Sequence, residues 1–216
     1  MNWLCECLTS SIGKKIQVAL AGLFLCTFLI VHLGGNLLLG AGPQIFNLYA
    51  DTLEARKSLL AVAEIGLLAL FLLHIIVALW VRWQNWQARP IGYTTTAWAG
   101  GRTLSSASAL YTGLIVAVFL VVHVRAMRFE ERAGTLYDHV LHELSGTPAA
   151  VFYLVCLGAL GVHLSHGVQA AAKTLGGDHP KFTPVIENAG LAFAIVITGA
   201  FAVIAVWGGW FAGGRP

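Results

Sequence analysis

The sequence predicts an all-α fold, an integral membrane bundle of five transmembrane helices that forms a single domain over residues 1–216. The chain is 57% hydrophobic and only 11% charged, whereas a soluble domain carries about 25% charged residues. Five apolar stretches each reach the ~20 residues that cross a hydrocarbon core. Backbone groups in lipid must be hydrogen-bonded within the segment, so these stretches are expected to be helices.

We expect the five helices near residues 16–39, 59–82, 106–128, 149–172 and 186–210. Polar or helix-breaking residues interrupt the apolar pattern between them, at 40–43, 89–101, 128–146 and 176–184. Each connection therefore ends one span and reverses the direction of the chain.

Charge and cysteine usage exclude several classes of protein. The net charge is only +3 and no basic cluster occurs, so nucleic acid is not an expected partner.

Residues 1–11 have no positive n-region, and the first apolar run is long enough to span, so we expect no cleavable signal peptide. Cys26 and Cys156 fall in apolar helices, and Cys5 and Cys7 form a C-x-C pair. No C-x-x-C-H occurs, which excludes covalently attached c-type haem.

Lysine and arginine in the flanks bear on orientation. With the N-terminus inside, seven cations fall on the cytoplasmic side and six on the outer side, and this bias does not fix the orientation alone. The cytoplasmic set is Lys14, Lys15, Arg82, Arg89, Arg102, Lys173 and Lys181, and the outer set is Arg56, Lys57, Arg125, Arg128, Arg132 and Arg215. We adopt a cytoplasmic N-terminus in the inner (cytoplasmic) membrane of the cell.

Four histidines lie within different apolar stretches: His32, His74, His123 and His163. An ionisable side chain at such depth is costly and usually marks a functional site. Because successive helices alternate in direction, His32 and His123 are expected toward the outer face, and His74 and His163 toward the cytoplasm. One buried histidine alone could be an ordinary core residue. Four at two matched depths favour two pairs of haem ligands, since neutral imidazole binds iron well.

Two points around these histidines stay open at the sequence level. Small residues follow the histidines closely, at Gly34, Gly35, Ala78 and Gly167. They leave room for a flat macrocycle, or they permit close helix–helix packing. His166 lies one turn from His163 and has a similar depth, so depth does not separate the two. The other histidines, His139, His142 and His179, are expected to be solvated loop residues.

Several motifs together resemble one known family, and the similarity covers nearly the whole chain. They are Ser10-Ser11-Ile12-Gly13-Lys14-Lys15, His32-Leu33-Gly34-Gly35-Asn36, Thr112-Gly113 with Phe119 and His123-Val124, and His163-Leu164-Ser165-His166-Gly167. The chain resembles the di-haem cytochrome b subunit of succinate dehydrogenases and menaquinol:fumarate reductases, in its single-subunit, five-helix form.

The resemblance implies two haem b groups, an outer haem held by His32 and His123 and an inner haem held by His74 and His163. The family pattern of a histidine, three residues and a glycine matches His163, which the resemblance favours over His166. It also implies two partners, a cytoplasmic flavoprotein subunit with the dicarboxylate site and an iron–sulfur subunit next to the inner haem. The chain itself is then the membrane anchor that reacts with a quinone, and the resemblance favours menaquinone.

Quinol oxidation releases protons, so a titratable group is expected on the outer side. The candidates are Asp51, Glu54 and Glu64. Asp51 and Glu54 could instead be solvated residues that pair with Arg56 and Lys57. Glu64 lies inside the second helix, where an unpaired carboxylate is expensive.

Cations near the two membrane faces are candidate partners for haem propionates. Arg125 and Arg128 suit the outer haem, and Arg82 and Lys173 suit the inner one. Each could equally extend to the interface as an ordinary flanking cation.

The sequence thus favours an electron-transfer subunit of a succinate:quinone or quinol:fumarate oxidoreductase. It would be part of an enzyme only as the quinone-reactive subunit, with no dicarboxylate chemistry of its own. The alternative is a di-haem cytochrome b of a hydrogenase or formate dehydrogenase. A metal-ion transporter, from another class, would be expected to have carboxylates beside the buried histidines, whose neighbours here are apolar. The direction of electron flow is not encoded in these features.

Overall fold

The computed structural model of the chain describes residues 2–88, 104–132 and 134–212, and in these ranges it contains helices and no strand. The main helices are α1 (Asn2–Thr9), α2 (Ser11–Leu37), α3 (Pro43–Glu54), α4 (Lys57–Gln87), α5 (Leu104–Val124), α6 (Leu136–Leu144), α7 (Thr147–Ala172) and α8 (Thr183–Trp207). Short helical turns follow four of them: η1 (Leu38–Ala41), η2 (Arg125–Phe129), η3 (Lys173–Gly177) and η4 (Gly208–Ala212).

Five helices, including the turns that extend them, are long and apolar enough to cross a membrane. They are Ser11–Ala41, Lys57–Gln87, Ser108–Phe129, Thr147–Gly177 and Thr183–Ala212. The predicted all-α fold with five membrane-spanning helices is therefore confirmed, and the chain is a multi-pass membrane protein. Three of the flanking cations lie outside the described residues: Arg89, Arg102 and Arg215.

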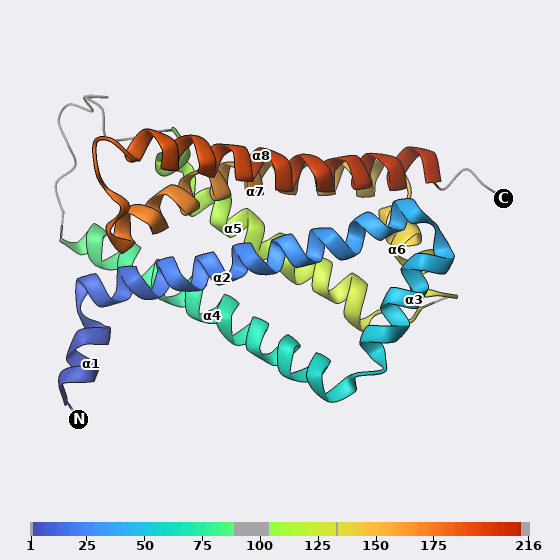
Figure 1. Ribbon diagram of the computed structural model, residues 1–216, viewed down its shortest axis with the longest axis horizontal. Helices are drawn as coiled ribbons and strands as arrows, with labels where there is room; N and C mark the ends of the chain where they lie inside the picture. The colour runs from blue at the N-terminus through green and yellow to red at the C-terminus, as the bar shows by residue number, and fades with distance from the viewer. Residues whose placement is uncertain (1, 89–103, 133, 213–216) are drawn as a thin grey trace.

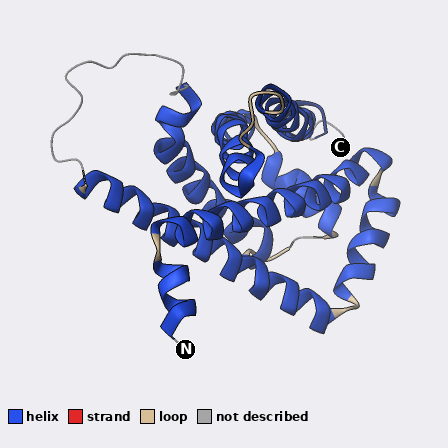
Figure 2. Cartoon of the chain, turned by 60° about the vertical axis from the view of Figure 1, so that its left-hand side comes forward, coloured by secondary structure: helices blue, strands red, loops and turns tan. Residues whose placement is uncertain are grey.

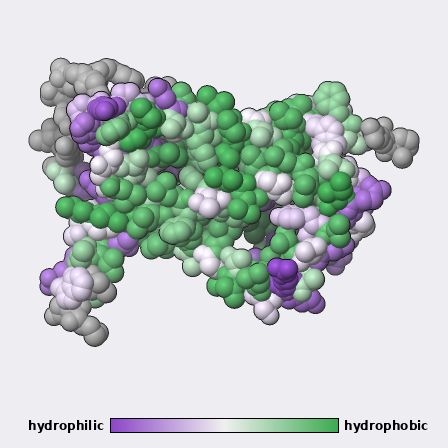
Figure 3. Space-filling view, in the orientation of Figure 1, coloured by the Kyte–Doolittle hydropathy of each residue, from purple (hydrophilic) through white to green (hydrophobic). Residues whose placement is uncertain are grey.

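The helices form a bundle with two distinct ends (Figure 1). The α1 end carries α1, the start of α2 and the end of α4, and the α3–α6 end carries α3, α6 and the last turn of α8. Hydrophobic side chains cover most of the visible surface between these ends, and hydrophilic ones gather near the ends (Figure 3). This distribution is the one expected of a bundle that crosses a hydrocarbon layer.

The most tightly packed part of the bundle lies between α2, α7 and α8. Its buried residues are Leu33, Leu157, Leu160, Leu164, Ala194, Ile197 and Ala205. By contrast, α4 buries only Val77 along its length. It lies beside α2 at the α1 end and diverges from it toward the α3–α6 end, where α3 bridges the two (Figures 1 and 2). α5 packs mainly on α7.

The N-terminal motif has a structural role at the start of α2. The Ser10 hydroxyl accepts a hydrogen bond from the Gly13 amide at 2.9 Å and so caps the helix. A Cβ at Gly13 would lie 1.9 Å from the Cys7 carbonyl oxygen, so only glycine fits there. Lys14 is buried, donates a hydrogen bond to the Gln84 side chain and joins α2 to α4 at the α1 end.

Two short helices lie in the connections between the predicted spans, α3 before the second span and α6 before the fourth. α3 begins with a proline after Gly42, whose φ of 95° favours glycine. α6 begins with a capping box in which Thr135 and Asp138 satisfy each other's backbone amides. His139 lies on α6 and is only 4% exposed, so the expectation that it is a solvated loop residue was wrong. Its Nε2 lies 3.1 Å from the Ala126 carbonyl oxygen, a partner that makes its burial tolerable.

Candidate functional site

His32 of α2 and His123 of α5 face each other and form what we call the outer pair. Their ring centres are 6.0 Å apart and the rings are nearly perpendicular, at 80°. A phenylalanine four residues earlier on the same helix stacks on each ring, Phe28 at 5.2 Å and Phe119 at 5.3 Å. Residues four apart share a helix face, so each histidine carries its own aromatic wall. Phe201 of α8 closes the site at 5.6 Å from His32.

His74 of α4 and His163 of α7 form the inner pair. Their ring centres are 6.4 Å apart, again nearly perpendicular at 81°. Each ring lies against a glycine of a neighbouring helix. A Cβ at Gly22 of α2 would lie 3.2 Å from Cε1 of His74, and a Cβ at Gly113 of α5 would lie 3.1 Å from Cε1 of His163. The backbones of α2 and α5 therefore come close to the two imidazoles only because these positions have no side chain.

The two pairs lie at two levels, and three helices give the same separation. On α5, Gly113 lies beside His163, and His123 follows ten residues later. On α7, Tyr153 lies beside His123, and His163 follows ten residues later. On α2, Gly22 lies ten residues before the outer-pair histidine. At 1.5 Å per residue, ten residues correspond to about 15 Å. The pairs are thus stacked along the helix axes, about half a hydrocarbon core apart.

The separation within each pair suits one metal ion between two imidazoles. Ring centres 6.0 and 6.4 Å apart would leave room for one metal ion between two facing imidazoles, because a metal–nitrogen bond is about 2 Å long. Two histidines per site are a ligand set that would suit a haem, whose porphyrin supplies the remaining nitrogens to the iron.

Three of the four histidines have an oxygen partner at Nδ1, as metal-binding histidines usually do. A proton on Nδ1 can be donated to that oxygen, which leaves Nε2 for a metal. The partner oxygens are the Val18 carbonyl for His74 at 3.2 Å, the Thr112 hydroxyl for His163 at 3.4 Å and the Tyr153 hydroxyl for His123 at 3.1 Å. Together with the ring separations, these contacts make the residues present fit two bis-histidine haems.

The structure bears on the choice between His163 and His166 and on the small residues near the histidines. His163 faces His74, whereas no ring contact of His166 occurs among the described residues. A Cβ at Gly34 or Gly167 would meet nothing within 4 Å, so these positions have open space beside them. Gly35 instead packs against the Tyr49 ring, whose hydroxyl would lie 2.8 Å from a Cβ there. Close packing against a neighbouring side chain therefore occurs at Gly35, whereas Gly34 and Gly167 leave open space.

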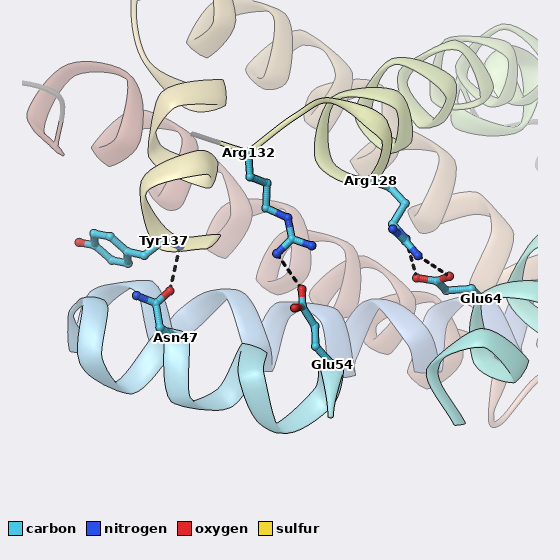
Figure 4. A network of polar contacts seen from close by, with 6 residues as sticks. All are labelled: Asn47, Glu54, Glu64, Arg128, Arg132 and Tyr137. Carbon is cyan, nitrogen blue, oxygen red and sulfur yellow. Dashed lines mark hydrogen bonds and ion pairs between the residues drawn. The ribbon is translucent and has the colours of Figure 1, made fainter. Parts of the chain in front are cut away.

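The candidate carboxylates lie at the α3–α6 end, and two of them are ion-paired (Figure 4). Arg128 donates to both carboxylate oxygens of Glu64, at 2.9 and 3.4 Å, and so links η2 to α4. Arg132 pairs with Glu54 of α3 at 2.7 Å. The side chain of Asp51 is exposed on α3. The expected loop partner of Glu54 was a neighbouring cation, but the structure supplies Arg132 from the segment after α5.

The candidate propionate-binding cations lie near the two ends of the bundle. Lys173 pairs with Glu187 at 2.8 Å, and Arg125 pairs with Glu130 at 3.6 Å. Arg82 is exposed near the end of α4. Arg128 is bound to a carboxylate, as described above. The structure thus places Arg82 and Lys173 at the α1 end and the two η2 arginines at the α3–α6 end.

Two features of the α3–α6 end were not anticipated from the sequence. Tyr153 contacts His123, and its position ten residues before His163 is the signal that could have identified it. The second feature is a polar pocket of about 310 Å³ beside α6. It is lined by Glu130, Glu131, Asp138, His139, His142 and Glu143. A hydrogen bond from the Thr135 hydroxyl holds the pKa of Asp138 below its ordinary value of 3.8.

Comparison with known proteins identifies no relative: no family model, no curated protein and no solved structure matches the chain. Functional inference therefore depends on the geometry of the two histidine pairs and on the motifs in the sequence.

Proposed function

We propose that the chain is the di-haem cytochrome b subunit of a succinate:quinone or quinol:fumarate oxidoreductase. In this role it anchors the complex in the membrane and passes electrons between a membrane quinone and a cytoplasmic iron–sulfur subunit. The observation that carries the proposal is the stacking of two histidine pairs, drawn from four helices, at two levels of one bundle.

The outer pair would hold one haem b and the inner pair the other. When bound, each haem supplies reversible one-electron transfer. The chain contributes the ligands, their orientation and an apolar surrounding that limits the access of water. Phe28, Phe119 and Phe201 provide that surrounding at the outer pair, and the backbones of α2 and α5 come close to the inner pair at Gly22 and Gly113.

The two ends of the bundle suit different partners. In the proposed orientation, the α1 end faces the cytoplasm, where the iron–sulfur and flavoprotein subunits would dock near the inner pair. The α3–α6 end faces the other side, where Asp51, Glu54 and Glu64 are candidates for taking protons from a quinol, menaquinol being the substrate that the sequence motifs favour. Glu54 and Glu64 are each paired with an arginine, Arg132 and Arg128 respectively, so each carboxylate is held in place at this end of the bundle.

Several motif residues support this assignment through what they do in the fold. The Ser10 cap and the Gly13 contact fix the start of α2, which carries a ligand of the outer pair. Thr112 and Gly113 both contact His163 of the inner pair. Motif residues thus lie at the start of a ligand-bearing helix and in direct contact with the inner pair.

The test is to express the full chain with its neighbouring subunits and to purify the complex in detergent. A reduced-minus-oxidised spectrum and a pyridine haemochrome assay should give two non-covalent b haems per chain. Flavin and iron–sulfur clusters should co-purify. Absence of haem in a folded, membrane-inserted protein would refute the proposal. If the chain held two b haems but co-purified with a hydrogenase or a formate dehydrogenase, the assignment of the haem sites would stand. The proposed complex would then be wrong.

A further inference from the structure

Tyr153 makes the side-chain contact to Nδ1 of His123 at the outer pair. Its hydroxyl oxygen lies 3.1 Å from Nδ1 of His123, and the two rings are edge-on with centres 6.0 Å apart. The Nδ1 contacts of the inner pair involve a backbone carbonyl, Val18, and a threonine hydroxyl at the longer distance of 3.4 Å. The shortest Nδ1 contact of the described histidine pairs is therefore made by a phenol.

The other histidine of the outer pair is held differently. The Asn36 amide nitrogen lies 3.5 Å from both ring nitrogens of His32, which is the outer limit for a hydrogen bond. The same amide makes a better bond, 2.8 Å long, to the His32 carbonyl oxygen. The ring of His32 is thus oriented mainly by stacking on Phe28, and its two nitrogens are not distinguished by Asn36.

Packing fixes the place of the Tyr153 hydroxyl. Its ring meets Phe119 edge-on at 5.3 Å and Phe152 at 6.0 Å. It also packs against both hydrophobic clusters of the bundle, the one that contains Leu157 and the one that contains Leu144. A hydroxyl on a ring held from several sides is a well-placed acceptor for the Nδ1 proton of His123.

We propose that Tyr153 is the positioning residue of the outer pair. Its oxygen accepts the Nδ1 proton of His123, which selects the tautomer whose Nε2 is free to bind a metal and fixes the plane of the ring. Such a hydrogen bond also raises the electron-donating strength of an imidazole ligand. The inference rests on the proposed function only in taking the bound group to be a haem.

The test is Tyr153→Phe in the full complex, because this change removes the hydroxyl and keeps the packing of the ring. Loss of an outer-shell hydrogen bond typically changes metal affinity by about 10–100-fold. A weaker ligand favours the reduced iron, so we expect the midpoint potential of the outer haem to rise. A tenfold change in the oxidised-to-reduced preference equals about 59 mV. The inner haem should keep its potential.

The matched control is Tyr137→Phe, the same change at a ring that packs on Phe46 of α3 and makes no contact with either histidine pair among the described residues. It should leave both potentials unchanged. Haem content and the two potentials are measured for each variant. A raised outer potential, or selective loss of the outer haem, supports the proposal. Unchanged potentials with two haems, equal shifts in both haems, or loss of the folded protein would overturn it. A wild-type complex without haem would instead refute the proposed function.

Discussion

Substitution of Gly113 tests whether the close approach of α5 to the inner pair matters for the bound group. A Cβ at this position would lie 3.1 Å from Cε1 and 3.5 Å from Nδ1 of His163. A Cβ contact of 3.1 Å requires the ring to move by a few tenths of an ångström. Gly113→Ala imposes that shift alone, and Gly113→Val adds two methyl groups at the same position. Overpacking of this kind costs about 1–3 kcal/mol.

That cost corresponds to an inner haem bound about 5–150-fold more weakly, since 1.4 kcal/mol is a factor of ten. The assay is transfer of haem from the purified protein to excess apomyoglobin, followed by absorbance. We expect faster loss of one haem in Gly113→Val, an intermediate rate in Gly113→Ala, and an unchanged second haem. Gly158→Ala on α7 is the control, because its Cβ would meet nothing within 4 Å. If Gly113→Val lost haem at the wild-type rate, the inner pair would not be the second haem site.

Three further predictions follow from the site. His163→Ala should lose the inner haem and keep the outer one, whereas His166→Ala should keep both, as haemochrome assays would reveal; the reverse result would exchange the ligand assignment. Glu64→Gln should slow quinol turnover without changing haem content, and unchanged turnover would remove this carboxylate from the reaction. The lowered pKa of Asp138 means that its bond with Thr135 adds stability above the ordinary value of 3.8 and loses it as the pH falls through the lowered pKa. Hydrogen exchange at the start of α6 should therefore quicken at that low pH, and Asp138→Asn should remove the dependence.

The number of spans and the depth of the histidines could be predicted because each depends on a property that is local in sequence. Apolar length sets the spans, and alternating direction with a fixed rise per residue sets depth. The pairing of His32 with His123 and of His74 with His163 follows from depth alone. Depth does not fix rotation about the helix axis, however. For that reason the ten-residue spacing between Gly22 and His32 gives the level of Gly22 in the bundle, but not that it faces the ring of His74.

The α3–α6 end was less predictable, because its contacts join segments far apart in sequence. The Glu64–Arg128 and Glu54–Arg132 pairs depend on how the chain turns after α5. α3 and α6 are short and carry charged residues, so hydropathy does not reveal them. The local signals were the proline that begins α3 and the capping box at the start of α6, a threonine followed three residues later by Asp138.

The distribution of carboxylates leads to a prediction about charge movement. Within the described spans, only Glu64 and Glu187 are acidic, and each is paired with a cation, Arg128 and Lys173 respectively. No carboxylate of these spans therefore lies between the two histidine levels to carry protons alongside electrons. The levels are about 15 Å apart in a hydrocarbon core of about 30 Å, so an electron passing between them crosses about half of the field.

Turnover with a membrane quinone should accordingly be electrogenic. An elementary charge crossing the whole membrane is worth about 2.3 kcal/mol per 100 mV, and half the field gives about 1.2 kcal/mol for each electron. In sealed vesicles, a potential-sensitive dye should report a potential during turnover, and an uncoupler should change the rate. The matched control is the His74→Ala complex, which should lack the inner haem and generate no potential. Sustained wild-type turnover at zero potential in tight vesicles would mean that protons cross with the electrons. Such a route would have to use groups other than the carboxylates of the described spans, because both of these are held in ion pairs near the helix ends.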